Sequence, residues 1–197
     1  MIRFAKQDMK KSTTHECVYR LKVSLDDVNP PVWRRIRVPG QISLRTLSYA
    51  LQIVMGWESS HRYRFVIGGT VYSIPDADDL HPTKDPNKIE MYRVLRETGE
   101  AFEYRHEVHD DWKHDVAVDA IEPPDPALNA PDCLEGSGAC PPSECGSPGE
   151  YRDFLDTLIK GEGRDRLCRA FRKHQNFDPE AFDREEINGR LTCIRLK

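Results

Sequence analysis

Alternating apolar and polar residues dominate the first third of the chain. Segment 17–25 carries an apolar side chain at every second position, and segment 32–38 repeats this period, with Trp33, Arg35 and Arg37 on its polar side. A period of two is typical of strands that are buried on one face. We therefore predict two strands, joined by turn residues at 26–31.

A helical pattern follows the second strand. Ser43 resembles an N-cap residue, apolar residues then recur at helical spacing, and Gly56 is placed to end the helix. Residues 62–67 and 71–74 alternate again around Gly68-Gly69, which predicts a hairpin. The order strand, strand, helix, strand suggests a β-grasp-like N-terminal half.

The stretch 102–120 predicts a second, central β-hairpin. Both of its arms alternate, and a three-residue loop at 109–111 would bring all facing pairs onto one side of the sheet. In this register the cross-strand neighbours are Val108 and Trp112, His106 and His114, Tyr104 and Val116, and Phe102 and Val118.

The other segments complete an α+β fold with an antiparallel or mixed sheet. We expect an exposed loop at 75–88, favour a helix at 89–97, and predict a long loop with little regular structure at 123–148, which is rich in proline, glycine and cysteine. Helices are predicted at 151–161 and 164–174, with two more helix starts at Asp178-Pro179 and at Asp183 with Glu186. The C-terminal quarter is therefore helical. A flexible segment at 1–16 precedes a single domain over 17–197.

Composition limits the size of the core, the kinds of partner and the cellular compartment that we expect for this chain. The 197 residues are 38% hydrophobic, which suffices for one sizeable core. A formal net charge of -4 gives no overall attraction to nucleic acid or to an anionic membrane. No signal peptide or membrane span is visible, so we expect a cytoplasmic protein with no membrane partner. Thiols stay reduced in that compartment, and the irregular spacing of the six cysteines argues against a disulfide framework.

Three cysteines in the 123–148 loop are candidate metal ligands. Cys133, Cys140 and Cys145 form C-x6-C-x4-C, and His114 or His106 could complete a tetrahedral set. Such an anchor would offset the entropy of ordering a loop with few ladder hydrogen bonds, and zinc suits thiolate and imidazole ligands. We predict zinc on Cys133, Cys140, Cys145 and His114. The alternative is that one or two of these cysteines are buried as small apolar groups.

Two further hypotheses for the function remain open. Cys140 or Cys145 could act as a nucleophile beside His114 in a metal-assisted or cysteine-dependent hydrolase. Arg34, Arg35 and Arg37, with arginines of the later hairpin, could bind single-stranded nucleic acid beside Trp33. The competing interpretation of that surface is a solvated sheet face whose arginines are neutralised by carboxylates.

A series of uncommon words also runs through the chain in order. Beginning at Val18, these words are VYRLKVSL, NPPVWRRIRVPG, LQIVMGW, DDWKH and CLEGSGACPPSECGSPGEY. Over roughly 17–191 the chain resembles the plasmid-borne Orf-three-like family, whose members also occur as transposon passengers. The resemblance implies an α+β fold and no established activity. In the family word YDFGDxWxH, only Asp110, Trp112 and His114 carry over directly.

These lines lead to one expectation for function. We expect a non-catalytic binding or accessory module of plasmid or mobile-element origin, whose partner is a protein or a nucleic acid. Its possible binding surface comprises Trp33, Arg35, Arg37, Asp110 and Trp112.

Overall fold

One antiparallel sheet organises the chain. The computed structural model describes residues 16–57, 62–75, 82–106, 112–160 and 173–196, and the statements below concern these ranges. Seven strands pair within them in the order β4-β3-β5-β6-β1-β2-β7. Their bounds are β1 Val18–Leu25, β2 Trp33–Pro39, β3 Tyr63–Ile67, β4 Thr70–Ser73, β5 Ala101–His106, β6 Trp112–Glu122 and β7 Asp132–Ser137.

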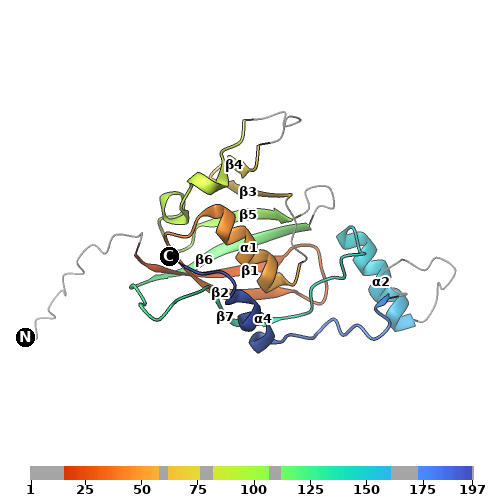
Figure 1. Ribbon diagram of the computed structural model, residues 1–197. Helices are drawn as coiled ribbons and strands as arrows, with labels where there is room; N and C mark the ends of the chain where they lie inside the picture. The colour runs from red at the N-terminus through yellow and green to blue at the C-terminus, as the bar shows by residue number, and fades with distance from the viewer. Residues whose placement is uncertain (1–15, 58–61, 76–81, 107–111, 161–172, 197) are drawn as a thin grey trace, which may run out of the picture.

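Helices cover one face of this sheet. In Figure 1, α1 (Leu44–Met55) lies across the sheet with α4 (Arg184–Leu191) beside it, while α2 (Pro148–Lys160) stands beyond one end of the strands. Two short 3₁₀ helices, Pro86–Lys88 and Met91–Arg93, connect β4 to β5. The opposite face carries no helix among the described residues (Figure 1). None of the helices in these ranges combines the length and apolar character that a bilayer span requires.

The capping residues act as the sequence predicts. Ser43 accepts a hydrogen bond from the backbone N–H of Thr46, and Gly56 closes α1 at a φ of 93°. That left-handed conformation is open to glycine at no steric cost. Asp183 caps α4 by accepting from the N–H of Glu186, and Gly68-Gly69 connects β3 to β4. Local sequence therefore sets where these elements begin and end.

The α+β class is confirmed, and the β-grasp interpretation is not. The strand, strand, helix, strand order is present, but β3 pairs with β4 and β5. The neighbours of β1 are β2 and β6, and both run antiparallel to it. In this sheet the later strand β6, rather than β3, completes the centre.

The central hairpin forms in a register two residues away from the predicted one. His106 pairs with Trp112 and Tyr104 pairs with His114, so His106 and His114 are not direct neighbours. A shift of two residues keeps every side chain on its expected face, because strand faces alternate with a period of two. Both histidines are accordingly buried on the helix side. The predicted loop at 109–111 lies outside the described residues.

Other segments differ from expectation in smaller ways. The stretch 123–148 contains β7, which forms an edge strand against β2. Within 89–97 the structure has only the short 3₁₀ helix Met91–Arg93 in place of an α-helix, and Asp178-Pro179 starts no helix. The predicted helix at 151–161 is confirmed as α2. The predictions for 1–16 and 164–174 fall almost wholly outside the described residues.

Candidate functional site

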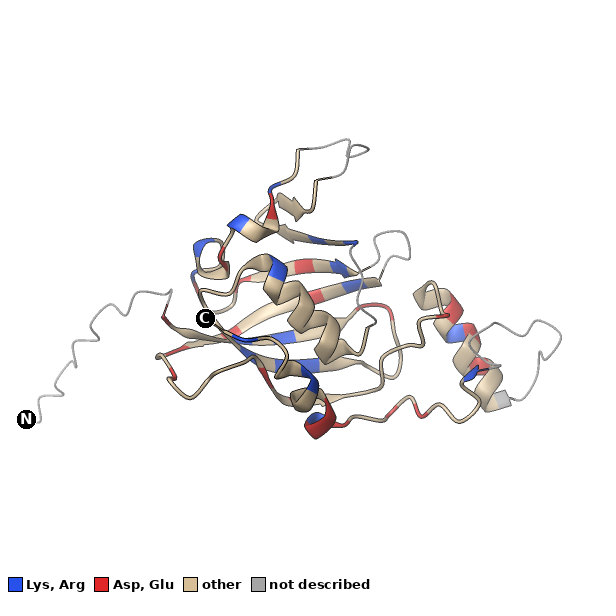
Figure 2. Cartoon of the chain, viewed as in Figure 1, with Lys and Arg blue, Asp and Glu red and all other residues tan. Residues whose placement is uncertain are grey.

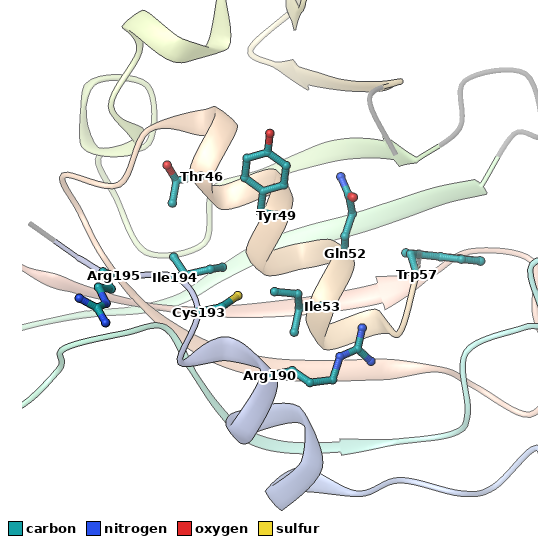
Figure 3. A pocket seen from close by; sticks show the side chains of 9 residues that line it. All are labelled: Thr46, Tyr49, Gln52, Ile53, Trp57, Arg190, Cys193, Ile194 and Arg195. Carbon is teal, nitrogen blue, oxygen red and sulfur yellow. The ribbon is translucent and has the colours of Figure 1, made fainter. Parts of the chain in front are cut away.

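A pocket between α1 and the C-terminal segment is the strongest candidate for a functional site. Its volume is about 490 Å³, within the range typical of small-molecule pockets. Figure 3 shows side chains of α1 on one wall and the chain after α4 on the other. The lining residues are Thr46, Tyr49, Gln52, Ile53, Trp57, Arg190, Cys193, Ile194 and Arg195.

The first wall comes from the side of α1 that does not face the sheet. Leu47, Leu51 and Val54 are fully buried against the sheet. Thr46, Tyr49 and Ile53 follow at spacings of three and four and are half-buried. Residues at this spacing share one helix face. The same helix thus presents one face to the core and another to the pocket.

Trp57 forms the end of this wall and is held rigidly. Its indole Nε1 donates a 2.9 Å hydrogen bond to Nε2 of His114. The indole ring also stacks on His106, with 5.0 Å between ring centroids, and lies 5.1 Å from the Trp112 ring. These contacts fix the indole, and therefore the shape of the pocket at this end.

His114 is a structural residue in this arrangement. The indole donor occupies its Nε2, so the ring proton belongs on Nδ1, which lies 3.2 Å from the carbonyl oxygen of Tyr104. Burial lowers the pKa of His114 to about 3, and the ring is fully buried. A neutral imidazole with both nitrogens engaged has no lone pair left for a metal ion or for a thiol proton.

The second wall is the C-terminal segment, anchored to the sheet edge. Asn188 on α4 accepts a 2.7 Å hydrogen bond from the Cys133 N–H and donates a 3.0 Å bond to the Cys133 carbonyl. Leu191 and Ile194 are the buried residues of this part of the chain. Arg190, Cys193 and Arg195 are exposed and line the pocket.

The charged side chains of this wall are all positive. Two of the nine lining residues are arginines and none is acidic. Within the described ranges, neither Arg190 nor Arg195 forms an ion pair. A larger hollow of about 770 Å³ between the 27–30 turn and α2 contrasts with it, because Asp27 and Asp156 offset Arg152 there.

The four predicted zinc ligands occupy separate environments. Cys133 lies on β7, where its thiol contacts the Glu135 carbonyl at 3.6 Å. Cys140 packs against the end of α1, because a Cβ atom added at Gly56 would lie 2.9 Å from the Cβ atom of Cys140. Among the described residues, no three His, Cys, Asp or Glu side chains are grouped as a metal ion requires. Zinc binding therefore stays a prediction without a ligand cluster to support it.

Burial also changes the chemistry of these thiols. Burial raises the pKa of Cys133 and raises that of Cys140 further. Cys145 is almost fully buried as well. Thiols in such surroundings stay protonated and are poor nucleophiles. Their environment matches the alternative in which they act as small apolar groups.

The predicted arginine surface is only partly formed. Arg35 and Arg37 point to the open face, but Arg35 pairs with Asp119 and Glu135, and Arg37 lies 2.5 Å from Asp132 and 3.1 Å from Asp125. These contacts raise the pKa of both arginines, chiefly through the hydrogen bonds to Asp119 and Asp132. The two guanidinium charges on this surface are thus already neutralised.

Of the other residues predicted for that surface, one is buried and one is not described. Trp112 is buried in the aromatic cluster around Trp57. Asp110 lies outside the described residues. Trp33 is half-buried on the open face, where the ammonium of Lys22 lies 5.6 Å and the Arg35 guanidinium 5.8 Å from its ring. Figure 2 shows blue and red positions side by side on the sheet strands.

Arg34 belongs to the opposite face, contrary to its place in the predicted basic surface. It is 3% exposed. Its guanidinium donates 2.8 Å hydrogen bonds to four backbone carbonyls, those of Val54, Trp33, Ser137 and Gly138. Its alternation with Trp33 and Arg35 already placed it inward, and this parity was the signal that sequence reasoning overlooked.

Comparison with known proteins places the chain in a family. Residues 17–186 match the family described as plasmid pRiA4b ORF-3-like protein. The chain is 34% identical over 142 residues to uncharacterized protein y4hQ of Sinorhizobium fredii, covering 72% of this chain and 73% of that protein. A crystal structure of the protein of unknown function MM3350 from Methanosarcina mazei Go1 has a TM-score of 0.75 at 27% identity, and the match covers 87% of this chain and 97% of that one. The chain therefore belongs to the plasmid pRiA4b ORF-3-like protein family.

Proposed function

We propose that the protein is a non-catalytic binding module and that the pocket between α1 and the C-terminal segment is its ligand site. The observation that carries this proposal is the pocket's construction. One wall is a capped helix followed by a fixed indole, and the other contributes two arginines that have no carboxylate partner among the described residues. An apolar hollow with a few polar groups is the usual form of a small-molecule site.

The hydrolase alternative has less support. It required a thiolate beside a histidine, whereas Cys140 lies in surroundings that favour the thiol, and both nitrogens of His114 are engaged. The nucleic-acid alternative is weakened by the ion pairs of Arg35 and Arg37. The plasmid association in the family's description agrees with an accessory role.

Dye binding tests the proposal directly. Two fluorescent probes with the same aromatic skeleton, neutral N-phenyl-1-naphthylamine and anionic 1-anilinonaphthalene-8-sulfonate, should both brighten on entering the pocket. Ile53→Trp fills the pocket from a half-buried position, so it should weaken binding at least about tenfold, or about 1.4 kcal/mol.

Ile159→Trp is the matched control. Ile159 is 81% exposed on α2 and does not line this pocket. The same substitution there should leave both dyes bound as in the unsubstituted protein. The proposal is wrong if neither dye binds, or if Ile53→Trp binds both as tightly as the control.

A further inference from the structure

Charge sets the pocket apart from the rest of the protein. The whole chain has a formal net charge of -4, yet the described residues that line the pocket include Arg190 and Arg195 and no carboxylate. On the open sheet face, by contrast, Arg35 and Arg37 each contact two carboxylates. Arginines left without such partners keep their donors available for a ligand oxygen.

The apolar part of the pocket lies against this charged part. Ile53 of α1 and Ile194 of the C-terminal segment line it together with the Trp57 indole. In Figure 3, Arg190 reaches from α4 toward Ile53, Arg195 lies toward the other end, and Cys193 is placed between the two arginines. A molecule inside therefore meets hydrocarbon and ring surfaces together with guanidinium groups.

We infer that the pocket selects small amphipathic anions, in which a carboxylate, sulfonate or phosphate is attached to an apolar body. The inference rests on the proposed ligand site and names its substrate class. The apolar body packs on Ile53, Ile194 and Trp57, and the acid group is hydrogen-bonded by one of the two arginines, Arg190 or Arg195. A neutral molecule of the same shape would use only the apolar contacts.

The two dyes separate this inference from the proposal beneath it. In the double variant Arg190→Gln, Arg195→Gln, the dissociation constant of the sulfonate dye should rise at least about tenfold, because charge-assisted hydrogen bonds are lost. That of the neutral dye should change by less than about twofold, since its contacts remain. Both arginines are exposed, so the fold should tolerate glutamine.

Arg184→Gln is the matched control. It removes one positive charge from the same helix α4, but Arg184 does not line the pocket. It should leave the binding of both dyes unchanged. Equal weakening of both dyes by the double variant, or none for the sulfonate dye, would overturn the inference while leaving a binding pocket. Failure of both dyes to bind the unsubstituted protein would instead remove the binding site itself.

Cys193 offers a second readout that does not depend on dye affinity. It is exposed, whereas Cys17, Cys133 and Cys145 are buried and Cys140 is half-buried. Cys168 lies outside the described residues and is replaced by serine in this experiment. The Cys193 thiolate attacks one sulfur of an aromatic disulfide, forming a mixed disulfide while one aryl thiolate leaves.

The ratio of two rates reports the local charge. The dianionic reagent 5,5′-dithiobis(2-nitrobenzoate) should react with Cys193 faster, relative to neutral 4,4′-dithiodipyridine, in the native pocket than in the double glutamine variant. We expect this ratio to fall at least about threefold in the variant and also on adding salt, because exposed charges are screened. A ratio unaffected by both changes would show that the arginines create no anion preference.

Discussion

Arg34 and Arg35 are adjacent on β2 and lie in opposite environments. Arg34 points into the helix-covered side, and its hydrogen-bond partners among the described residues are all backbone carbonyls. Arg35 points to the open side and pairs with Asp119 and Glu135 in reach of solvent. On the covered side a polar contact replaces lost hydration, whereas on the open side it competes with water. The same chemical group should therefore matter very differently on the two faces.

The largest effect is expected from Arg34→Met. This substitution keeps an apolar stem but leaves four carbonyls without their donor, at a cost of about 3–5 kcal/mol in the free energy of unfolding. Urea unfolding followed by circular dichroism measures it. A loss below about 1 kcal/mol would mean that the covered face does not depend on this guanidinium, and the contrast between the faces would fail.

Trp57→Phe tests a second polar contact on the covered side. Phenylalanine retains an aromatic ring but leaves the buried Nε2 of His114 without its donor, which should cost about 1–3 kcal/mol. The same urea experiment applies. Trp33→Phe on the open face is the control and should cost less, because the Trp33 ring is only half-buried and the described part of the structure gives its indole N–H no hydrogen-bond partner.

The sequence predicts the elements better than their partners. Ser43, Gly56 and Asp183 are identified by local chemistry, because a cap acts within its own turn. The shift in the central hairpin was invisible to a period-two pattern, which is unchanged when a strand slips by two residues. The strand β7 is stabilised by its pairing with β2, and its glycine-containing sequence has no alternating pattern that would predict a strand.

The site was missed for a related reason. Its two walls are far apart in sequence, and only tertiary packing brings Arg190 and Arg195 to α1. Cysteines and histidines attracted the prediction because of what they can ligate or transfer, but ligation depends on convergence in space. Arg34 was assigned by its charge, although its parity along the strand indicated burial.

The pH dependence of stability sharpens the same comparison. The lowered pKa of His114 means that the unfolded chain takes up a proton below about pH 6.5 while the native chain does not until about pH 3. The contribution of neutral His114 to the free energy of unfolding is therefore complete above pH 6.5. As the pH falls from 6.5 toward 3, the free energy of unfolding decreases by up to about 1.4 kcal/mol per pH unit. Unfolding free energies between pH 7 and pH 5 should show this slope.

His114→Gln provides the reference for that slope. Glutamine does not titrate, so the variant should be less stable at pH 7 but should lose less stability on acidification than the native protein. Identical slopes in the two proteins would indicate that His114 is protonated as readily in the native state as in the unfolded one.

The smallest effect is expected from Arg35→Met, the counterpart of the Arg34 substitution on the neighbouring residue. The pairs with Asp119 and Glu135 are partly exposed, so the loss should be below about 1 kcal/mol and should shrink further at high salt. A loss approaching that of Arg34→Met would show that the ion pairs of the open face form a cooperative network.

The hydrogen bonds of Arg34 also have a consequence for how the chain is made. Two of its four acceptors, the carbonyls of Ser137 and Gly138, lie 103 and 104 residues further along the chain. During synthesis the ribosome therefore releases β1, β2 and α1 long before the groups that satisfy this buried cation exist. The centre of the sheet also cannot form until β6 has been synthesised, because β1 pairs with β6. The N-terminal half therefore cannot complete its fold alone. The nascent polypeptide remains accessible to chaperones and proteases until the last third of the chain has been synthesised.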